Sequence, residues 1–276
     1  MKLALGERVV DLTTRSLVMG ILNRTPDSFY DKGSYWQMDQ FLARADQLVS
    51  EGADLLDVGG VKAGPGDHVS ESEELERVVP AISALVARFD VPISVDTWRA
   101  SVAAAAFSAG AVMGNDISGF ADPQYLTVAA SFGATVVATH IRLAPRVPDP
   151  DPVYDDVVSA VSDFLADRAA RALSAGVAAD RIVLDAGLDL GKTAAQSLVL
   201  LRASDRLAGL GYPLLLSASN KTFLGRTLGL EIDSRGSASL AAAALGVSLG
   251  CRIVRAHDVR GTRRVCDVLA AIMSAT

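Results

Sequence analysis

Short apolar runs alternate with longer amphipathic stretches along almost the whole chain. Eight of the apolar runs are rich in Val, Ile and Leu and are bounded by Gly, Asp or Asn, which is typical of buried β-strands. These predicted strands are 17–22, 54–58, 93–96, 112–115, 135–139, 182–185, 213–217 and 252–256. Stretches with a helical period fill the gaps, for example 71–89, 155–175 and 193–210. Gly176 and Gly211 follow the last two of these, where helix C-termini favour glycine.

Strands that are apolar on both faces and separated by helices indicate a parallel sheet, and eight such units indicate closure into an α/β (β/α)8 barrel. With 276 residues, half of them hydrophobic, the chain suits a single domain over 1–276. The segment 3–12 remains outside the repeat, and we expect a short N-terminal hairpin that plugs the barrel floor. Four prolines within 142–152 predict a long exposed loop after the fifth strand.

Charge and composition exclude several function classes. A net charge of -6 and a pI near 5.1 provide no basic face for nucleic acid. Two cysteines, Cys251 and Cys266, offer neither a disulfide framework nor metal-ligand spacing. No signal peptide or membrane-spanning run is recognised, so we expect a cytoplasmic protein without nucleic-acid or membrane partners.

In a barrel of this kind the active site lies where the strands end at their carboxyl side. Polar residues at the predicted strand ends are therefore candidate site residues. The polar residues at these ends are Asn23, Asp57, Asp96, Asn115, His140, Asp185, Ser219, Arg255 and His257. His140 suits either the site or the core.

Five polar residues at one mouth would suit a flat heterocycle. The carboxylates of Asp96 and Asp185, with the amide of Asn115, match the donors and acceptors of an aminopyrimidinone edge. Arg255 and Lys221 add donors and positive charge. This set is typical of a pterin site.

Three further groups suit an anion. Asn23, Ser219 and His257 offer donors for an anionic group, and their oxygens suit a hard divalent cation. Together with the preceding set, they predict a heterocycle that carries a diphosphate.

Six segments resemble the signatures of dihydropteroate synthases, which join a pterin diphosphate to p-aminobenzoate. The similarity covers nearly the whole chain. The segments are MGILNRTPDSFYDKG (19–33), ISVDTWRA (93–100), GNDISG (114–119), LDAGLDLGK (184–192), ASNKTFLG (218–225) and RAHDV (255–259).

The resemblance assigns roles to the same residues. Asp96 and Lys221 would be catalytic, Asp96 by stabilising the cation that forms when diphosphate leaves. The pterin would be bound by Asp96, Asn115, Asp185, Lys221 and Arg255. The diphosphate would be bound by Asn23, Ser219, Arg255 and His257, with Mg2+ beside Asn23. The resemblance also implies a homodimer, and the Ala-rich segment 237–250 is compatible with one.

The chain departs from the family pattern on the side of the acceptor. The family reads Gly-Gly-Glu-Ser-Thr-Arg-Pro-Gly in its second loop, whereas this chain reads GGVKAGPG over 59–66. An acid, a hydroxyl and a guanidinium are therefore missing. Asn220 replaces an Arg, Asp189 replaces a Gly, and Leu190 stands where a Phe would contact the aryl ring. For Asp189, the sequence allows pairing with Lys192 or Lys221, or an exposed cap on the following helix.

These changes leave two main hypotheses. In the first, the chain binds the pterin diphosphate with weak or absent dihydropteroate synthesis, like the divergent synthase-like second copies of some actinobacteria, which it resembles. In the second, it is an active synthase with an arylamine acceptor, in which Lys62 or Arg24 compensates for the lost loop residues. A pterin-dependent methyltransferase on the same barrel is a third, less supported interpretation. Otherwise Arg24 and Lys62 would be solvated loop charges.

Overall fold

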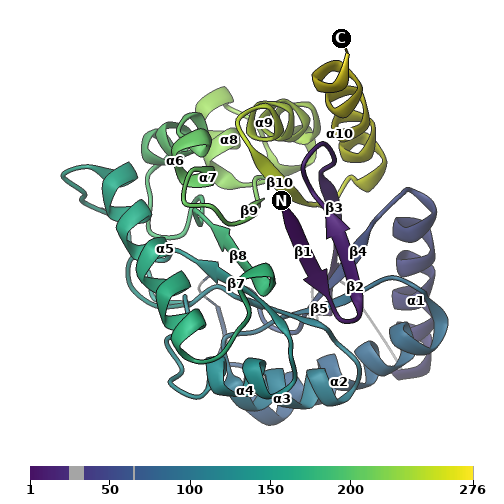
Figure 1. Cartoon of the computed structure of the whole chain (residues 1–276). Helices are drawn as coiled ribbons and strands as arrows, with labels where there is room; N and C mark the ends of the chain where they lie inside the picture. Colours follow the sequence, from purple (N-terminus) through teal and green to yellow (C-terminus); the bar gives the residue numbers. More distant parts are fainter. Residues whose placement is uncertain (25–33, 65, 276) are drawn as a thin grey trace.

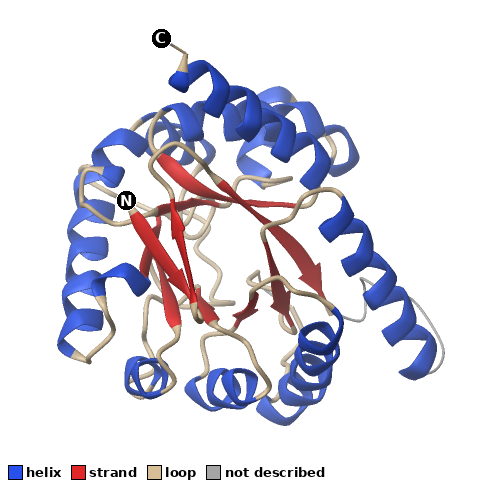
Figure 2. Cartoon of the chain, turned by 45° about the vertical axis from the view of Figure 1, so that its right-hand side comes forward, coloured by secondary structure: helices blue, strands red, loops and turns tan. Residues whose placement is uncertain are grey.

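The computed structural model describes residues 1–24, 34–64 and 66–275, with the side chains of 34–37 left undescribed. Its centre is a closed barrel of eight parallel strands, which Figures 1 and 2 show inside a ring of helices. The strand order is β10-β3-β4-β5-β6-β7-β8-β9, so that chain neighbours are also sheet neighbours. The prediction of a (β/α)8 barrel is confirmed.

The barrel strands match the predicted runs closely. Their bounds are β3 (Leu17–Asn23), β4 (Leu55–Gly59), β5 (Ile93–Asp96), β6 (Met113–Asp116), β7 (Thr135–Thr139), β8 (Ile182–Asp185), β9 (Leu214–Leu216) and β10 (Cys251–Ala256).

The helices surround the barrel and bury their apolar faces against its outer side. Their bounds are α1 (Ser34–Ser50), α2 (Glu71–Arg88), α3 (Ala100–Ser108), α4 (Tyr125–Ser131), α5 (Val157–Ser174), α6 (Ala194–Arg202), α7 (Ser204–Ala208), α8 (Thr222–Leu228), α9 (Gly236–Ser248) and α10 (Val259–Ser274), with short 3-10 turns η2 (Ala179–Arg181) and η3 (Ile232–Ser234). None of the described helices is long and apolar enough to cross a membrane.

The single helix expected over 193–210 is wrong, because the structure divides it into α6 and α7 at Ala203. The hydroxyl of Ser204 donates to the carbonyl of Leu201 at 2.8 Å. Such a local bond offers the backbone an alternative to the continuous helical ladder. Periodicity alone does not reveal this competition.

The N-terminal hairpin closes the bottom of the barrel, as predicted. Strands β1 (Lys2–Leu5) and β2 (Arg8–Asp11) pair antiparallel and lie across the barrel opening in Figure 1. Leu3 and Leu5 belong to the same buried cluster as Met113 and Val137 from inside the barrel. The floor of the barrel is therefore filled, and the space inside the barrel above this cluster opens at the opposite end.

The long loop after β7 contains no helix or strand, as its prolines predict. It nevertheless makes specific contacts. The Tyr154 hydroxyl donates to the Gly191 carbonyl at 2.8 Å, and the Arg146 amide donates to the Ala63 carbonyl at 3.2 Å. The loop therefore connects the segments that follow β4 and β8.

Candidate functional site

A ring of polar side chains lies directly above the apolar floor. Alternate residues of a strand face the same side, so the residue two positions after a floor residue points into the barrel one layer higher. Thus the floor residue Leu55 is followed two positions later by Asp57, and the floor residue Met113 by Asn115. The members of the ring are Asp57, Asp96, Asn115, Thr139, Asp185, Ser217 and Arg255.

Above this ring lies a cavity of about 390 Å³. We call it the ring cavity. It brings together all five residues that the sequence predicts around a pterin, namely Asp96, Asn115, Asp185, Lys221 and Arg255. Residues separated by up to 159 positions thus meet at one mouth. The remaining lining residues are Ala63, Gly64, Ile117, Thr139, Asp189, Leu190, Ser217 and Thr222.

Arg255 joins two carboxylates across the mouth. Its Nε donates to Asp57 Oδ2 at 2.6 Å, and its Nη2 donates to Asp96 Oδ2 at 2.9 Å. Burial lowers the pKa of Arg255, but the attraction of Asp57 and Asp96 outweighs that effect and raises it. These two bonds use two of the five guanidinium hydrogens, so three remain for a ligand.

Asp57 is fully buried and lies at the centre of the network. Its Oδ2 also accepts a hydrogen bond of 3.1 Å from Asn115 Nδ2, whereas its Oδ1 has no partner among the described residues. Sequence reasoning placed Asp57 at a strand end but gave it no role. Asp57 lies two residues after the apolar Leu55 in one strand, so strand periodicity could have indicated that its side chain points into the barrel.

Asp96 holds a proton more tightly than an ordinary carboxyl group. Burial raises its pKa to about 7, with Asp57 adding to the rise and Arg255 opposing it. Near neutral pH the group therefore exists in both protonation states, so its charge responds to a bound ligand.

Asp185 and Lys221 form the opposite wall. Asp185 Oδ1 accepts a hydrogen bond of 2.8 Å from the Gly187 amide, and Lys221 Nζ donates to the Leu188 carbonyl at 2.6 Å. Burial raises the pKa of Asp185 and lowers that of Lys221, and each group opposes the shift of the other. The wall therefore presents a carboxyl group beside a lysine amine, and each favours the charged form of the other.

A second cavity of about 340 Å³ also has Arg255 among its lining residues. Ser219 and His257 line it, and Arg255 lines both cavities. The Ser219 hydroxyl lies 3.0 Å from His257 Nδ1 and accepts a 3.2 Å bond from the His257 amide. Three of the four residues predicted to bind a diphosphate are thus in one place.

His257 is neutral at pH 7. Burial and the nearby charges of Arg255 and Arg44 lower its pKa to about 4. One ring nitrogen then carries a proton and the other accepts, and the Ser219 hydroxyl beside Nδ1 can take either role. The side chain therefore contributes a neutral ring, and the positive charge nearby comes from Arg255.

Asn23, the fourth of these residues, ends β3 at the rim. A Cβ atom on Gly59 would lie 3.5 Å from Asn23 Oδ1 and 3.6 Å from Asp96 Oδ2, so the two oxygens converge above this glycine. An amide oxygen is a suitable Mg2+ ligand, but one such oxygen binds weakly without phosphate oxygens. No group of three His, Cys, Asp or Glu suited to a metal occurs in the described part of the chain. The residues fit a Mg2+ ion that arrives with a diphosphate. The rest of the opening motif, 25–33, lies outside the described residues.

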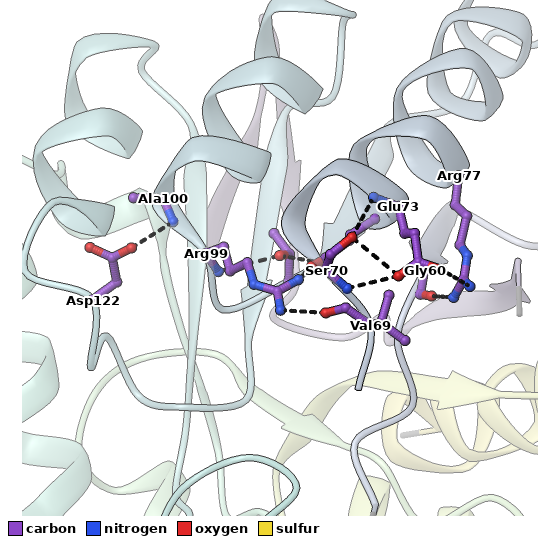
Figure 3. Close-up of polar contacts among 10 residues, drawn as sticks. Gly60, Val69, Ser70, Glu73, Arg77, Arg99, Ala100 and Asp122 are labelled. Atoms are coloured by element: carbon purple, nitrogen blue, oxygen red, sulfur yellow. Dashed lines mark hydrogen bonds and ion pairs between the residues drawn. The ribbon is translucent and has the colours of Figure 1, made fainter. Parts of the chain in front are cut away.

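The second loop is anchored at both ends, as Figure 3 shows. At one end, Arg77 Nη1 donates to the Gly60 carbonyl at 2.9 Å. At the other, Arg99 Nη2 donates to the Val69 carbonyl at 2.8 Å while pairing with Glu74. The middle of the loop, with Ala63 and Gly64, forms a wall of the ring cavity. The fold thus retains the loop although its side chains have changed.

Arg24 is not a solvated loop charge, and that interpretation is wrong. Its Nη1 donates to the Arg77 carbonyl at 2.9 Å, and its guanidinium lies 5.9 Å from the centre of the Phe41 ring. Burial lowers its pKa. The guanidinium is therefore bonded to α2 behind the loop. Lys62 is exposed on the loop itself.

Asp189 has a different role from those expected. Both of its carboxylate oxygens accept from the Phe223 amide at 3.1 Å, so it caps α8 rather than the helix that follows it. It makes no ion pair with Lys192 or Lys221 among the described contacts. Asp189 and Asn220 adopt left-handed φ values of 68° and 57°, which Asp and Asn tolerate better than most residues.

Lys192 and His140 are both buried, and neither lines the ring cavity. Of the two alternatives for His140, the site or the core, the structure therefore favours the core. Lys192 Nζ lies 2.8 Å from His140 Nδ1 and donates to the carbonyls of Gly187 and Leu190 at 2.8 and 2.9 Å. This buried ammonium holds the segment that carries Asp189 and Leu190. Burial lowers its pKa to about 7. Sequence reasoning assigned no such role.

Comparison with known proteins extends these observations. A sequence model described as pterin binding enzyme matches residues 19–257. The chain is 44% identical over 270 residues to inactive dihydropteroate synthase 2 of Mycobacterium leprae, with 94% of this chain and 91% of that protein covered. It is 40% identical over 262 residues to dihydropteroate synthase of Bacillus subtilis, with 94% and 90% covered. The Xanthomonas albilineans dihydropteroate synthase with 4-aminobenzoic acid has a TM-score of 0.92 and 38% identity, with 100% of this chain and 99% of that one covered.

Proposed function

The chain belongs to the dihydropteroate synthase family of pterin-binding enzymes, and on that premise we propose that it binds 6-hydroxymethyl-7,8-dihydropterin diphosphate but makes little or no dihydropteroate. The main support for the proposal is a contrast between the pterin side and the acceptor side of the barrel mouth. The polar ring around Arg255 is complete, whereas Ala63 and Gly64 provide no donor on the acceptor side. Binding is therefore retained and group transfer is suppressed.

The ring cavity would hold the pterin. The Asp185 carboxylate would accept the two N–H groups of the aminopyrimidinone edge, and Asn115 would bond to the opposite edge through its amide oxygen. Lys221 would lie against the carbonyl side. Because burial opposes the charges of both Asp185 and Lys221, a ligand that satisfies both is bound strongly.

The cavity beyond Arg255 would hold the diphosphate. Arg255 has three hydrogens left for it, and His257 and Ser219 add neutral donors. Mg2+, held by Asn23 and diphosphate oxygens, would supply further positive charge to the leaving group. Asp96 lines the ring cavity and bonds to Arg255, so a cation at the pterin methylene would form beside it, and its anionic form would stabilise that cation.

Turnover is the part that we expect to be lost. Removal of one charge-assisted contact in a transition state costs about 3 kcal/mol, or roughly two orders of magnitude in rate. Two such contacts are absent at Gly64 and Asn220. The similar identities to an inactive and an active relative, 44% and 40%, do not favour either state by themselves. The site residues therefore carry the argument.

An active synthase is the second candidate, and the 40% identity to the Bacillus subtilis enzyme supports it. Arg24 is a poor source of compensation, because its guanidinium is bonded to the Arg77 carbonyl behind the loop. Lys62 is the remaining candidate, since it is exposed on the second loop. If Lys62 compensates, Lys62→Ala abolishes dihydropteroate formation.

Calorimetry with the pterin diphosphate and a turnover assay with p-aminobenzoate on the same preparation test the proposal. We expect Mg2+-dependent binding that Asp185→Asn abolishes and Asp205→Asn, an exposed change on α7, leaves intact. Binding that survives in the Asp185 variant would refute the pocket assignment. Rapid dihydropteroate formation by the wild-type chain would refute the loss of turnover.

We also infer that the chain acts as one pterin-binding domain that forms a homodimer through α9 and α10. These helices pack side by side at one edge of the barrel in Figure 1. Large apolar residues remain exposed on them, among them Leu245 at 42%, Val268 at 53%, Ile272 at 63% and Met273 at 45%. Exposed large apolar residues gathered on two adjacent helices are typical of a subunit interface.

A further inference from the structure

Residues 186–191, which follow β8 and which we call the β8 segment, support both charged groups of the wall opposite Asp96. The Gly187 amide donates to Asp185 Oδ1 at 2.8 Å, and the Leu188 carbonyl accepts from Lys221 Nζ at 2.6 Å. Asp185 and Lys221 both line the ring cavity. Their positions in the cavity therefore depend on where the backbone of this segment lies.

The β8 segment has an unusual backbone. Gly187, Asp189 and Gly191 have φ values of 63°, 68° and 64°, in the left-handed region that residues with side chains rarely adopt. A Cβ atom on Gly187 would collide with the carbonyl oxygen of His140, so the segment passes very close to the end of β7. A sparsely populated conformation of this kind persists where surrounding contacts impose it. The segment therefore needs an anchor.

Lys192 provides this anchor. Its Nζ lies 2.8 Å from the Gly187 carbonyl oxygen, 2.9 Å from that of Leu190 and 2.8 Å from His140 Nδ1. Burial lowers the pKa of His140 to about 3, so the ring is neutral and Nδ1 can accept. An ammonium group has three hydrogens, one for each of these acceptors. The charged form of Lys192 therefore satisfies the whole set.

The neutral form of Lys192 cannot do the same. An amine has only two hydrogens, so one of the three acceptors loses its donor. Burial lowers the pKa of Lys192 to about 7, and the charge of Lys221 adds to this effect, whereas Asp185 opposes it. Both forms are therefore populated near neutral pH, and they hold the segment unequally.

The charged and titratable groups around Lys192 come from several elements. They are Asp185 at the end of β8, Asp189 in the β8 segment, Lys221 before α8, His140, Asp149 and Tyr154 after β7, and Arg168 of α5, which acts on His140. Lys192 itself is 6% exposed and does not line the ring cavity. Any effect on a ligand must therefore pass through the segment or through the electrostatic field of the charge.

We propose that Lys192 is a positioning residue of the pterin site, whose ammonium group holds the β8 segment so that the Gly187 amide and the Leu188 carbonyl orient Asp185 and Lys221 toward the ligand. The identity of that ligand rests on the proposed function. The affinity for the pterin then depends on the charge of a side chain that the pterin does not touch. Binding weakens as Lys192 loses its proton.

Calorimetry with 6-hydroxymethyl-7,8-dihydropterin at pH 6.5 and pH 8.5 tests this role. We expect Lys192→Met to bind the pterin about tenfold more weakly than the wild-type chain at pH 6.5, and about twofold more weakly at pH 8.5, where the wild-type amine is also neutral. Asp96 titrates in this range in both proteins, so the ratio of their affinities isolates Lys192.

Two further variants separate positioning from stability. Leu48→Ala removes a buried side chain of α1 and costs a similar amount of stability, but should leave pterin affinity unchanged. Lys192→Gln keeps N–H donors without the charge, so it should recover part of the affinity at pH 6.5 and reduce the pH dependence. It also serves as the test if Lys192→Met does not fold.

Equal affinities of the wild-type chain and the Lys192 variants would overturn the proposal. The same would follow from a loss of equal size at both pH values, or from an equal loss in Leu48→Ala. A wild-type chain that does not bind the pterin would instead refute the proposed function. The two proposals are thus tested separately.

Discussion

Arg255 and Asp57, 198 positions apart, are joined by a 2.6 Å bond between Nε and Oδ2 inside the barrel. The bond, with a second one to Asp96, fixes the guanidinium beside the ring cavity. A buried pair of this kind depends on both partners, because an unpaired buried charge is costly.

The first prediction concerns this pair. Asp57→Asn leaves Arg255 with only Asp96 as a partner, so we expect a loss of about 3 kcal/mol in the free energy of unfolding and weaker pterin binding. Asp90→Asn, which breaks an exposed pair with Arg8, should change stability by less than about 0.5 kcal/mol. Urea denaturation of both variants measures the difference. Equal effects would show that burial of Asp57 contributes nothing.

The second prediction is a pH dependence. Because burial raises the pKa of Asp96 to about 7, the folded state binds a proton between about pH 4 and 7 that the unfolded state releases. Asp96 therefore makes stability fall as pH rises through this range. Asp116, whose pKa burial raises to about 6, acts in the same direction. Unfolding of Asp96→Asn at pH 5 and pH 8 isolates the Asp96 contribution. The decline should be smaller than in the wild-type chain, and an identical decline would contradict the assignment.

The third prediction concerns Lys192, which we expect to hold the segment after β8. Lys192→Met removes its bonds to the carbonyls of Gly187 and Leu190 and should cost about 2–4 kcal/mol of stability. The exposed change Lys2→Met serves as the control. Hydrogen exchange should show faster opening of 187–191 in Lys192→Met alone. Unchanged protection would mean that the segment is held by other contacts.

The fourth prediction restores the acceptor side. Gly64 has no positive φ, and a Cβ atom there would meet none of the described atoms within 4 Å, so Ala63→Thr with Gly64→Arg is expected to fold normally. These changes should increase dihydropteroate formation about 100-fold over the wild-type rate, because one charge-assisted contact is regained. Adding Asn220→Arg should raise it further. No gain in any combination would mean that turnover is limited elsewhere.

The fifth prediction concerns the homodimer. Ile272 is 63% exposed on α10, and Ile272→Asp should place a charge within the expected interface. Analytical ultracentrifugation should then detect monomers, while a control change at the exposed Val9 on the hairpin leaves the dimer intact. A wild-type chain that sediments as a monomer would end this inference.

The sequence determined the barrel because strand and helix periods alternate eight times, and this local pattern permits few folds. The sequence also identified the polar residues at the strand ends. The strands follow one another around the barrel in chain order, so these residues meet at one end of the barrel. Only the tertiary structure decided how these groups interact. The central position of Asp57, the binding of Arg24 to α2, the cap that Asp189 provides for α8 and the bonds of Lys192 all depend on segments distant in sequence. Such contacts follow from side-chain directions and packing between elements, which a one-dimensional pattern does not contain.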